Sequence, residues 1–177
     1  PVVVSAMTAG PTKGTLIVGG VDGRVELWTI AMGQPIQVFD RHTSCVNGVA
    51  LLPEGRGFVS GSEDGTVCLW SFACPTEPTV IEADSEAVTS VAVSALGTRM
   101  VFGSKDHCAC VWQLAPHVGR IHRFKHTSQV TAVSLTRDGR LAVAGCLDGT
   151  LSVWDIADGS RMWCTKREVG GICTMCL

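Results

Sequence analysis

The 177-residue sequence has no tyrosine, little charge and no long hydrophobic run. Charged residues make up 17% of it and apolar residues 46%, whereas roughly 25% of an ordinary soluble domain is charged. We therefore expect a chain that buries most of itself rather than a disordered one. No apolar run approaches the roughly 18 residues of a transmembrane helix. Lys and Arg number 14 against 16 Asp and Glu, which argues against direct binding of nucleic acid or an anionic membrane.

Cysteine is abundant, with nine residues, but an odd number at these spacings predicts no disulfide framework. Free cysteine is usually buried and persists in reducing compartments, so we expect an intracellular protein, cytoplasmic or nuclear. His107-Cys108-x-Cys110 and Cys173-x-x-Cys176 raise the question of zinc. Neither spacing supplies the four converging ligands of a structural zinc site, so we predict no metal and no cofactor.

The sequence repeats itself every 42 residues. Tryptophan, aspartate and glycine each keep this step over four copies, at Trp28, Trp70, Trp112 and Trp154, at Asp22, Asp64, Asp106 and Asp148, and at Gly19, Gly61, Gly103 and Gly145. Internal repeats of 40 to 45 residues are typical of β-propeller blades. The repeat therefore suggests four copies of one structural unit.

Within one period the local pattern is β throughout. Phe58–Ser62 and Thr66–Trp70 are short runs separated by Glu63-Asp64-Gly65, and Asp-Gly supplies the positive φ of a tight hairpin. Val46–Leu51 and Pro78–Ile81 indicate two further strands, and no window shows a sustained helical period. Four strands of about five residues account for one period, which predicts a four-stranded antiparallel blade.

The segments Gly61–Trp70 and Gly145–Asp155 resemble the WD-repeat family of β-propellers. The likeness covers essentially the whole chain, although the Trp-Asp pair of the family stands only at Trp154-Asp155. The resemblance implies an all-β fold, with four four-stranded antiparallel blades and the first strand of a fifth. The blades are expected at about 2–40, 44–82, 86–125 and 128–166, with a fifth beginning in about 169–177.

Such propellers usually close with seven blades, so the resemblance implies an incomplete ring. An open arc would expose apolar blade faces, which favours aggregation. The first residue is Pro1 rather than Met, and we expect a fragment whose remaining blades the same parent chain supplies. The alternative is an eight-bladed ring made by two chains.

The resemblance also implies an internal hydrogen-bond network. Its members are His42, Ser60, Asp64 and Trp70 in the second blade, His126, Asp148 and Trp154 in the fourth, Asp106 and Trp112 in the third, and Asp22 and Trp28 in the first. A Ser-His-Asp trio also suggests a hydrolase, but a nucleophile must be exposed beside an oxyanion hole. We expect buried groups that satisfy one another, no catalytic residue, and a third blade that is least rigid because it lacks the histidine.

By resemblance, the chain is a non-catalytic scaffold that assembles a multiprotein complex through the top face of its propeller. The top-face residues carried over are Ser5, Asn47, Thr89 and Thr131, then Cys45 and Gln129 two residues before that set, and Val21, Glu63, Lys105 and Leu147 just before the turn aspartates. This mildly polar face predicts a peptide or protein domain as partner, with Glu63 and Lys105 setting its orientation. The alternative is a regulatory or sensor propeller domain of a larger multidomain enzyme or switch protein.

Overall fold

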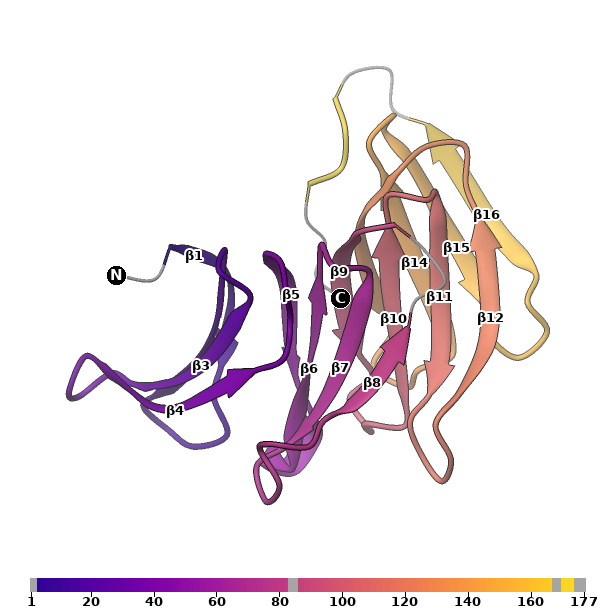
Figure 1. The fold of residues 1–177 in the computed structure, drawn as a ribbon. Coiled ribbons are helices and arrows are strands. Elements are labelled where there is room, and N and C mark those ends of the chain that lie inside the picture. Colours follow the sequence, from indigo (N-terminus) through magenta and orange to yellow (C-terminus); the bar gives the residue numbers. More distant parts are fainter. Residues whose placement is uncertain (1–2, 83–85, 167–169, 174–177) are drawn as a thin grey trace. The chain divides into compact units, whose positions relative to one another are not determined.

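A computed structural model describes residues 3–82, 86–166 and 170–173 of the chain. The chain divides into two compact units, residues 1–88 and 89–177, and each consists mainly of two four-stranded antiparallel sheets (Figure 1). The predicted all-β fold of four-stranded antiparallel blades is confirmed, and the strands of each sheet follow one another in chain order. No helix in the described residues is both long and apolar enough to cross a membrane.

The first unit contains the sheets of the first two periods. The strands of the first sheet are β1 (Val4–Ala9), β2 (Thr15–Gly20), β3 (Arg24–Thr29) and β4 (Gln34–Asp40). Those of the second are β5 (Val46–Leu51), β6 (Gly57–Ser62), β7 (Thr66–Ser71) and β8 (Thr79–Glu82), with a 3-10 turn η1 (Pro53–Gly55) between β5 and β6.

The second unit repeats this arrangement. The strands of its first sheet are β9 (Val88–Val93), β10 (Arg99–Ser104), β11 (Cys108–Gln113) and β12 (Gly119–Lys125), where β9 begins on the last residue of the first unit. Those of the last sheet are β13 (Val130–Leu135), β14 (Leu141–Cys146), β15 (Thr150–Asp155) and β16 (Arg161–Lys166).

The expected start of a fifth blade, about 169–177, lies mostly outside the described residues. Its described part, Gly170–Cys173, has no strand assignment. The N–H of Ile172 donates to the Cys146 carbonyl at 3.2 Å. The Thr131 hydroxyl also donates to the Ile172 carbonyl, so the described part of this segment lies against the last sheet.

Apolar residues of consecutive sheets pack face to face within each unit. In the first unit, Ile17, Leu27 and Phe39 lie in one buried cluster with Phe58 and Trp70 of the next sheet. The Phe39 ring centroid lies 4.8 Å from that of Phe58 and 5.3 Å from that of Trp70. The repeating indole is therefore a packing anchor between sheets, which is why it recurs once per period.

The repeating glycine marks the closest approach between sheets. A Cβ atom added at Gly19 would lie 2.7 Å from Val46 Cγ1, and one added at Gly103 would lie 2.6 Å from Val130 Cγ1. In both cases the valine belongs to the inner strand of the next sheet. A side chain at these positions would push the sheets apart, so glycine is needed there.

Candidate functional site

One chain of hydrogen bonds runs through the second sheet, from its β6–β7 turn into the core. Asp64 Oδ2 lies 3.0 Å from His42 Nδ1, and His42 Nε2 lies 2.7 Å from Ser60 Oγ. Trp70 Nε1 donates to the same Ser60 oxygen at 2.8 Å. The backbone N–H and the hydroxyl of Thr66 both donate to Asp64 Oδ1. The structure thus brings the four residues singled out in this blade into one network.

The Asp-His-Ser order matches that of a hydrolase triad, but the hydroxyl is inaccessible. Ser60 is 0% exposed and its oxygen already accepts a hydrogen bond from Trp70, so it cannot meet a substrate. Burial lowers the pKa of His42, although Asp64 opposes the shift. Burial would raise the pKa of Asp64, but hydrogen bonds from Thr66 and the Thr43 backbone lower it overall. A neutral imidazole and a carboxylate therefore join the turn to the core at pH 7.

The fourth sheet keeps the histidine and the indole but lacks the hydroxyl between them. Ala144 stands two periods after Ser60, and both His126 Nε2 and Trp154 Nε1 are buried without a hydrogen-bond partner in the described part of the chain. The centroids of the two rings are 5.9 Å apart, against 6.5 Å for His42 and Trp70. Burial lowers the pKa of His126 to about 4. The ring geometry is similar in the two sheets, and the polar link is missing in the fourth.

The third sheet replaces the missing histidine with an arginine. Arg123 Nη2 on β12 donates to Asp106 Oδ2 at 2.7 Å, and the Arg123 side chain is 43% exposed. Phe102 occupies the position of Ser60, and Trp112 Nε1 is buried without a hydrogen-bond partner among the described residues. The motif comparison missed Arg123 because it lies on the outer strand, where the repeat conserves no residue type in this sequence.

The first sheet uses a buried acid instead. Trp28 Nε1 donates to Glu26 Oε2 at 2.7 Å, and Glu26 is buried. Asp22 is exposed and accepts a hydrogen bond from the Arg24 backbone N–H. Residues two apart on a strand share a face, so the spacing of Glu26 and Trp28 could have revealed this pair.

Ser5, Asn47, Thr89 and Thr131 share one structural role. Each side chain donates to the backbone carbonyl 41 residues further along the chain: Ser5 to Val46 at 2.6 Å, Asn47 to Val88 at 2.9 Å, Thr89 to Val130 at 2.5 Å, and Thr131 to Ile172. The register shifts at Ser5, Asn47 and Thr131, and such a β-bulge redirects a side chain. These hydroxyl and amide donors are bonded to backbone, and the contact of these four residues with a partner stays a prediction.

The turn residues beside that set are tied to the inner strands. The N–H of Val21 donates to the Val3 carbonyl, that of Glu63 to Cys45, and that of Leu147 to Gln129, each at 2.9 Å. We call these three contacts the turn pairs. Val21 is 49% and Leu147 56% exposed, and Glu63 is also exposed. Lys105 takes the same turn position in the third sheet and is half-buried. Each turn pair holds two side chains at one end of its sheet.

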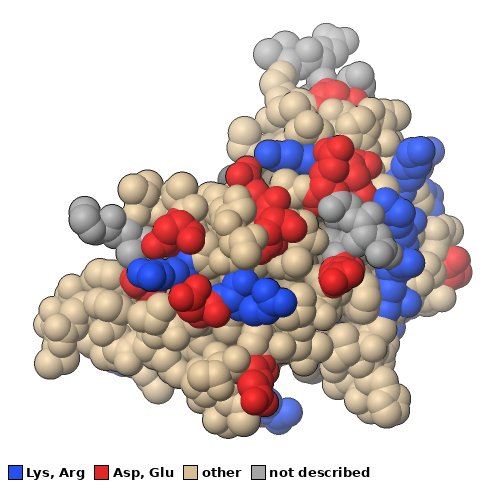
Figure 2. All heavy atoms as spheres, in the orientation of Figure 1, with Lys and Arg blue, Asp and Glu red and all other residues tan. Residues whose placement is uncertain are grey.

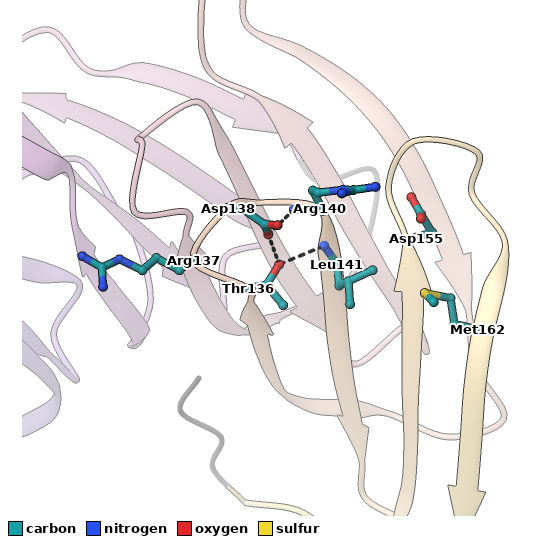
Figure 3. Close-up of a pocket in the computed structure, with 7 residues that line it drawn as sticks. All are labelled: Thr136, Arg137, Asp138, Arg140, Leu141, Asp155 and Met162. Atoms are coloured by element: carbon teal, nitrogen blue, oxygen red, sulfur yellow. Dashed lines mark hydrogen bonds between the residues drawn. The ribbon is translucent and has the colours of Figure 1, made fainter.

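A pocket of about 550 Å³ lies beside the β13–β14 turn (Figure 3). Thr136 Oγ1 donates to Asp138 Oδ1 at 2.6 Å, and the Arg140 backbone N–H donates to the same oxygen at 3.0 Å. These hydrogen bonds lower the pKa of Asp138. Asp155 and Met162 form the far wall (Figure 3). The Asp138 carboxylate is thus hydrogen-bonded within its own turn. Because catalysis needs convergent titratable groups, we assign this pocket no chemistry.

Nothing in the described ranges forms a metal centre. In residues 3–82, 86–166 and 170–173, no group of three His, Cys, Asp or Glu is arranged to hold an ion. Cys108 and Cys110 are buried, and burial raises the pKa of the Cys110 thiol to about 12. The eight described cysteines are free. Cys108 and Cys110 lie in β11 as strand residues.

Comparison with protein families gives a match to the WD domain, G-beta repeat, over residues 33–71, 76–113 and 119–155. Each match ends one residue after a repeating tryptophan, at Trp70, Trp112 or Trp154. A search of curated proteins gives no match to the chain. WD40 repeats generally mediate protein–protein interaction and scaffolding, and they are typically non-catalytic. With three matched repeats, four sequential sheets and a 42-residue tryptophan period, this chain belongs to the WD40 repeat family.

Proposed function

We propose that the chain is a non-catalytic scaffold that assembles a protein complex, and that it contacts its partners at the turn pairs. The observation that carries this proposal is the exposure of Val21 and Leu147 at turns held by backbone hydrogen bonds. Apolar side chains fixed at an exposed position gain free energy when a partner covers them. A rigid turn also loses little conformational entropy when the partner binds.

The charged turn residues complement this contact. Glu63 and Lys105 occupy the turn position of Val21 and Leu147 in the second and third sheets. Charges at the rim of an interface affect orientation and association rate more than affinity. We therefore assign the affinity to the apolar turn residues and the orientation of the bound peptide or domain to Glu63 and Lys105.

The test is protein capture by the immobilised chain, followed by binding of the purified captured protein. Variant Val21→Asp with Leu147→Asp should reduce capture more than tenfold, while Glu63→Ala with Lys105→Ala should reduce it less. The matched apolar control is Ile30→Asp with Leu96→Asp, at exposed turn residues on the β3–β4 and β9–β10 connections. Lys13→Ala with Glu54→Ala is the control for the charged pair, since both residues are exposed on other connections.

Thermal unfolding of every variant must match that of the unmodified chain, so that lost capture is not lost folding. Equal losses with Ile30→Asp and Leu96→Asp would mean that any exposed apolar residue supports capture. Unchanged capture by Val21→Asp with Leu147→Asp would refute the assignment of the contact to the turn pairs.

A further inference from the structure

The nearly neutral chain is strongly divided in charge. Residues 1–88 contain four Lys or Arg and ten Asp or Glu, whereas residues 89–177 contain ten Lys or Arg and six Asp or Glu. Figure 2 shows Lys and Arg side chains in a row along β12 of the second unit. That strand carries Arg120, Arg123 and Lys125 and no acidic residue. The second unit therefore presents a locally basic surface that the overall net charge conceals.

This basic strand ends at a cleft of about 560 Å³, which we call the β12–β16 cleft. Its rim includes Lys125, at the end of β12, and Arg161, at the start of β16, and both are exposed. Buried Thr150 and Ser152, together with the buried ring of His126, also line it. The cleft lies entirely within the second unit, where the end of β12 and the connection after it line it together with β15 and β16.

Among the described residues that line the cleft, the two cations Lys125 and Arg161 outnumber the one carboxylate, Asp148. Asp148 accepts hydrogen bonds from the Thr127 hydroxyl and the Thr150 backbone N–H, each at 3.1 Å. Burial holds the pKa of His126 at about 4, so this ring is neutral at pH 7. The Arg161 guanidinium carbon lies 5.7 Å from the centroid of the Trp154 ring, and this cation–π contact favours one orientation of the guanidinium.

The paired cations occur only in this copy of the repeat. Two periods earlier, the positions of Lys125 and Arg161 are Arg41 and Glu77, so the second copy combines a base with an acid. In the third sheet, Arg120 lies opposite Trp112 as Arg161 lies opposite Trp154, but the sequence has Ala83 one period before Lys125. The pair of cations is thus a feature of this chain's last complete copy rather than of the repeat.

We propose that the β12–β16 cleft is a docking site for an acidic segment of a partner protein, whose carboxylates pair with Lys125 and Arg161. The argument is charge complementarity: two cations stand at the rim of a hollow with hydroxyl groups in its lining. A guanidinium can bind a carboxylate through two parallel hydrogen bonds, and an ammonium adds a point charge beside it. Arg123 is already paired with Asp106, so it adds to the positive potential near the cleft and is not assigned a direct contact with the acidic segment.

The test uses a fluorescein-labelled peptide of ten glutamates, titrated with the full chain while anisotropy is recorded. Lys125→Glu with Arg161→Glu should weaken binding at least tenfold, and added salt should weaken binding to the unmodified chain. Arg137→Glu with Arg140→Glu is the matched control, because both residues are exposed in the same unit and the change in charge is identical. This control should stay within about twofold of the unmodified chain.

Equal losses in the two charge-reversed variants would mean diffuse attraction and would overturn the proposal, as would undiminished binding by Lys125→Glu with Arg161→Glu. If that variant does not fold, Lys125→Gln with Arg161→Gln repeats the test without reversed charge. The inference rests on the proposed scaffold function but uses a separate surface. Val21→Asp with Leu147→Asp should leave peptide affinity unchanged, so failure at the turn pairs and failure at the cleft can be distinguished.

Discussion

Replacing Ala144 with serine should stabilise the protein, which is unusual for a polar substitution at a buried position. In the second sheet, the Ser60 hydroxyl lies within 2.7 Å of His42 Nε2 and 2.8 Å of Trp70 Nε1. In the fourth sheet, the corresponding nitrogens of His126 and Trp154 are buried without partners in the described residues, and Ala144 stands where the hydroxyl would be. The change Ala144→Ser supplies one oxygen to both nitrogens.

The magnitude follows from what those nitrogens lose at present. A buried polar atom without a partner costs about 1–3 kcal/mol, and a hydrogen bond to a neutral group contributes about 1 kcal/mol net. The serine hydroxyl must itself be desolvated, which offsets part of the gain. We therefore expect the free energy of unfolding to rise by about 1–3 kcal/mol, equivalent to a Tm increase of roughly 2–4 °C per kcal/mol for a chain of this size.

The assay is urea and thermal unfolding followed by tryptophan fluorescence, with exchange of the Trp154 indole N–H as a local readout. Ser60→Ala is the reverse change and should destabilise the second sheet by about 2–4 kcal/mol, because it leaves two nitrogens unpaired. Ala142→Ser is the matched control, since Ala142 is buried two residues away on the same face of β14. It should destabilise the protein, because a hydroxyl at position 142 is not placed to bond either unpaired nitrogen and would be buried without a partner.

If Ala144→Ser is no more stable than Ala142→Ser, the two unpaired nitrogens do not limit stability and the reasoning is wrong. A rise in Tm without slower exchange of the Trp154 indole would also contradict it, because the gain would then come from elsewhere.

Two further outcomes test the same polar groups. Backbone amides of the Asp106 turn should exchange faster than those of the Asp64 turn, and 0.5 M salt should accelerate only the former, because Arg123 is partly exposed and its ion pair is screened. Hydrogen-exchange mass spectrometry measures both effects. Because the pKa of His126 is about 4 in the folded chain against 6.5 as its reference, the unfolded chain binds more protons between these values. Stability should therefore fall as the pH drops from 6.5 toward 4, and His126→Gln should flatten that slope in urea midpoints, whereas an unchanged slope would mean that other groups titrate.

The repeat was predictable because its determinants are local or strictly periodic. Asp-Gly turns force hairpins, alternating residues define strand faces, and one tryptophan per 42 residues marks the packing anchor. The resemblance to the WD-repeat family is confirmed on these features. The strand bounds shifted by a residue or so, as for β8 at Thr79–Glu82 rather than Pro78–Ile81, because strand ends depend on the ladder of the neighbouring strand.

The identity of the network partners was less predictable. Arg123 on β12 does in the third sheet what His42, in the β4–β5 connection, does in the second. Glu26, on the same strand as Trp28, does what Ser60 does from the strand beside Trp70, so neither could be found by matching positions of the repeat. In each case a side chain of another type bonds the polar atom that is equivalent in the repeat, which is the turn carboxylate of Asp106 for Arg123 and the indole nitrogen of Trp28 for Glu26. Sequence spacing reveals such compensation only when both partners lie on one strand.

The amino-acid sequence alone determined the number, order and strand composition of the repeating units, since these depend on turns, alternation and period. Only the tertiary structure decided which groups the periodic polar side chains bond. Ser5, Asn47, Thr89 and Thr131 are predicted contact residues, and the structure adds that each donates to backbone 41 residues away. The bulge that redirects three of these side chains lies on one strand, and each accepting carbonyl lies in a segment 41 residues further along the chain. The two groups therefore meet only after these segments have packed.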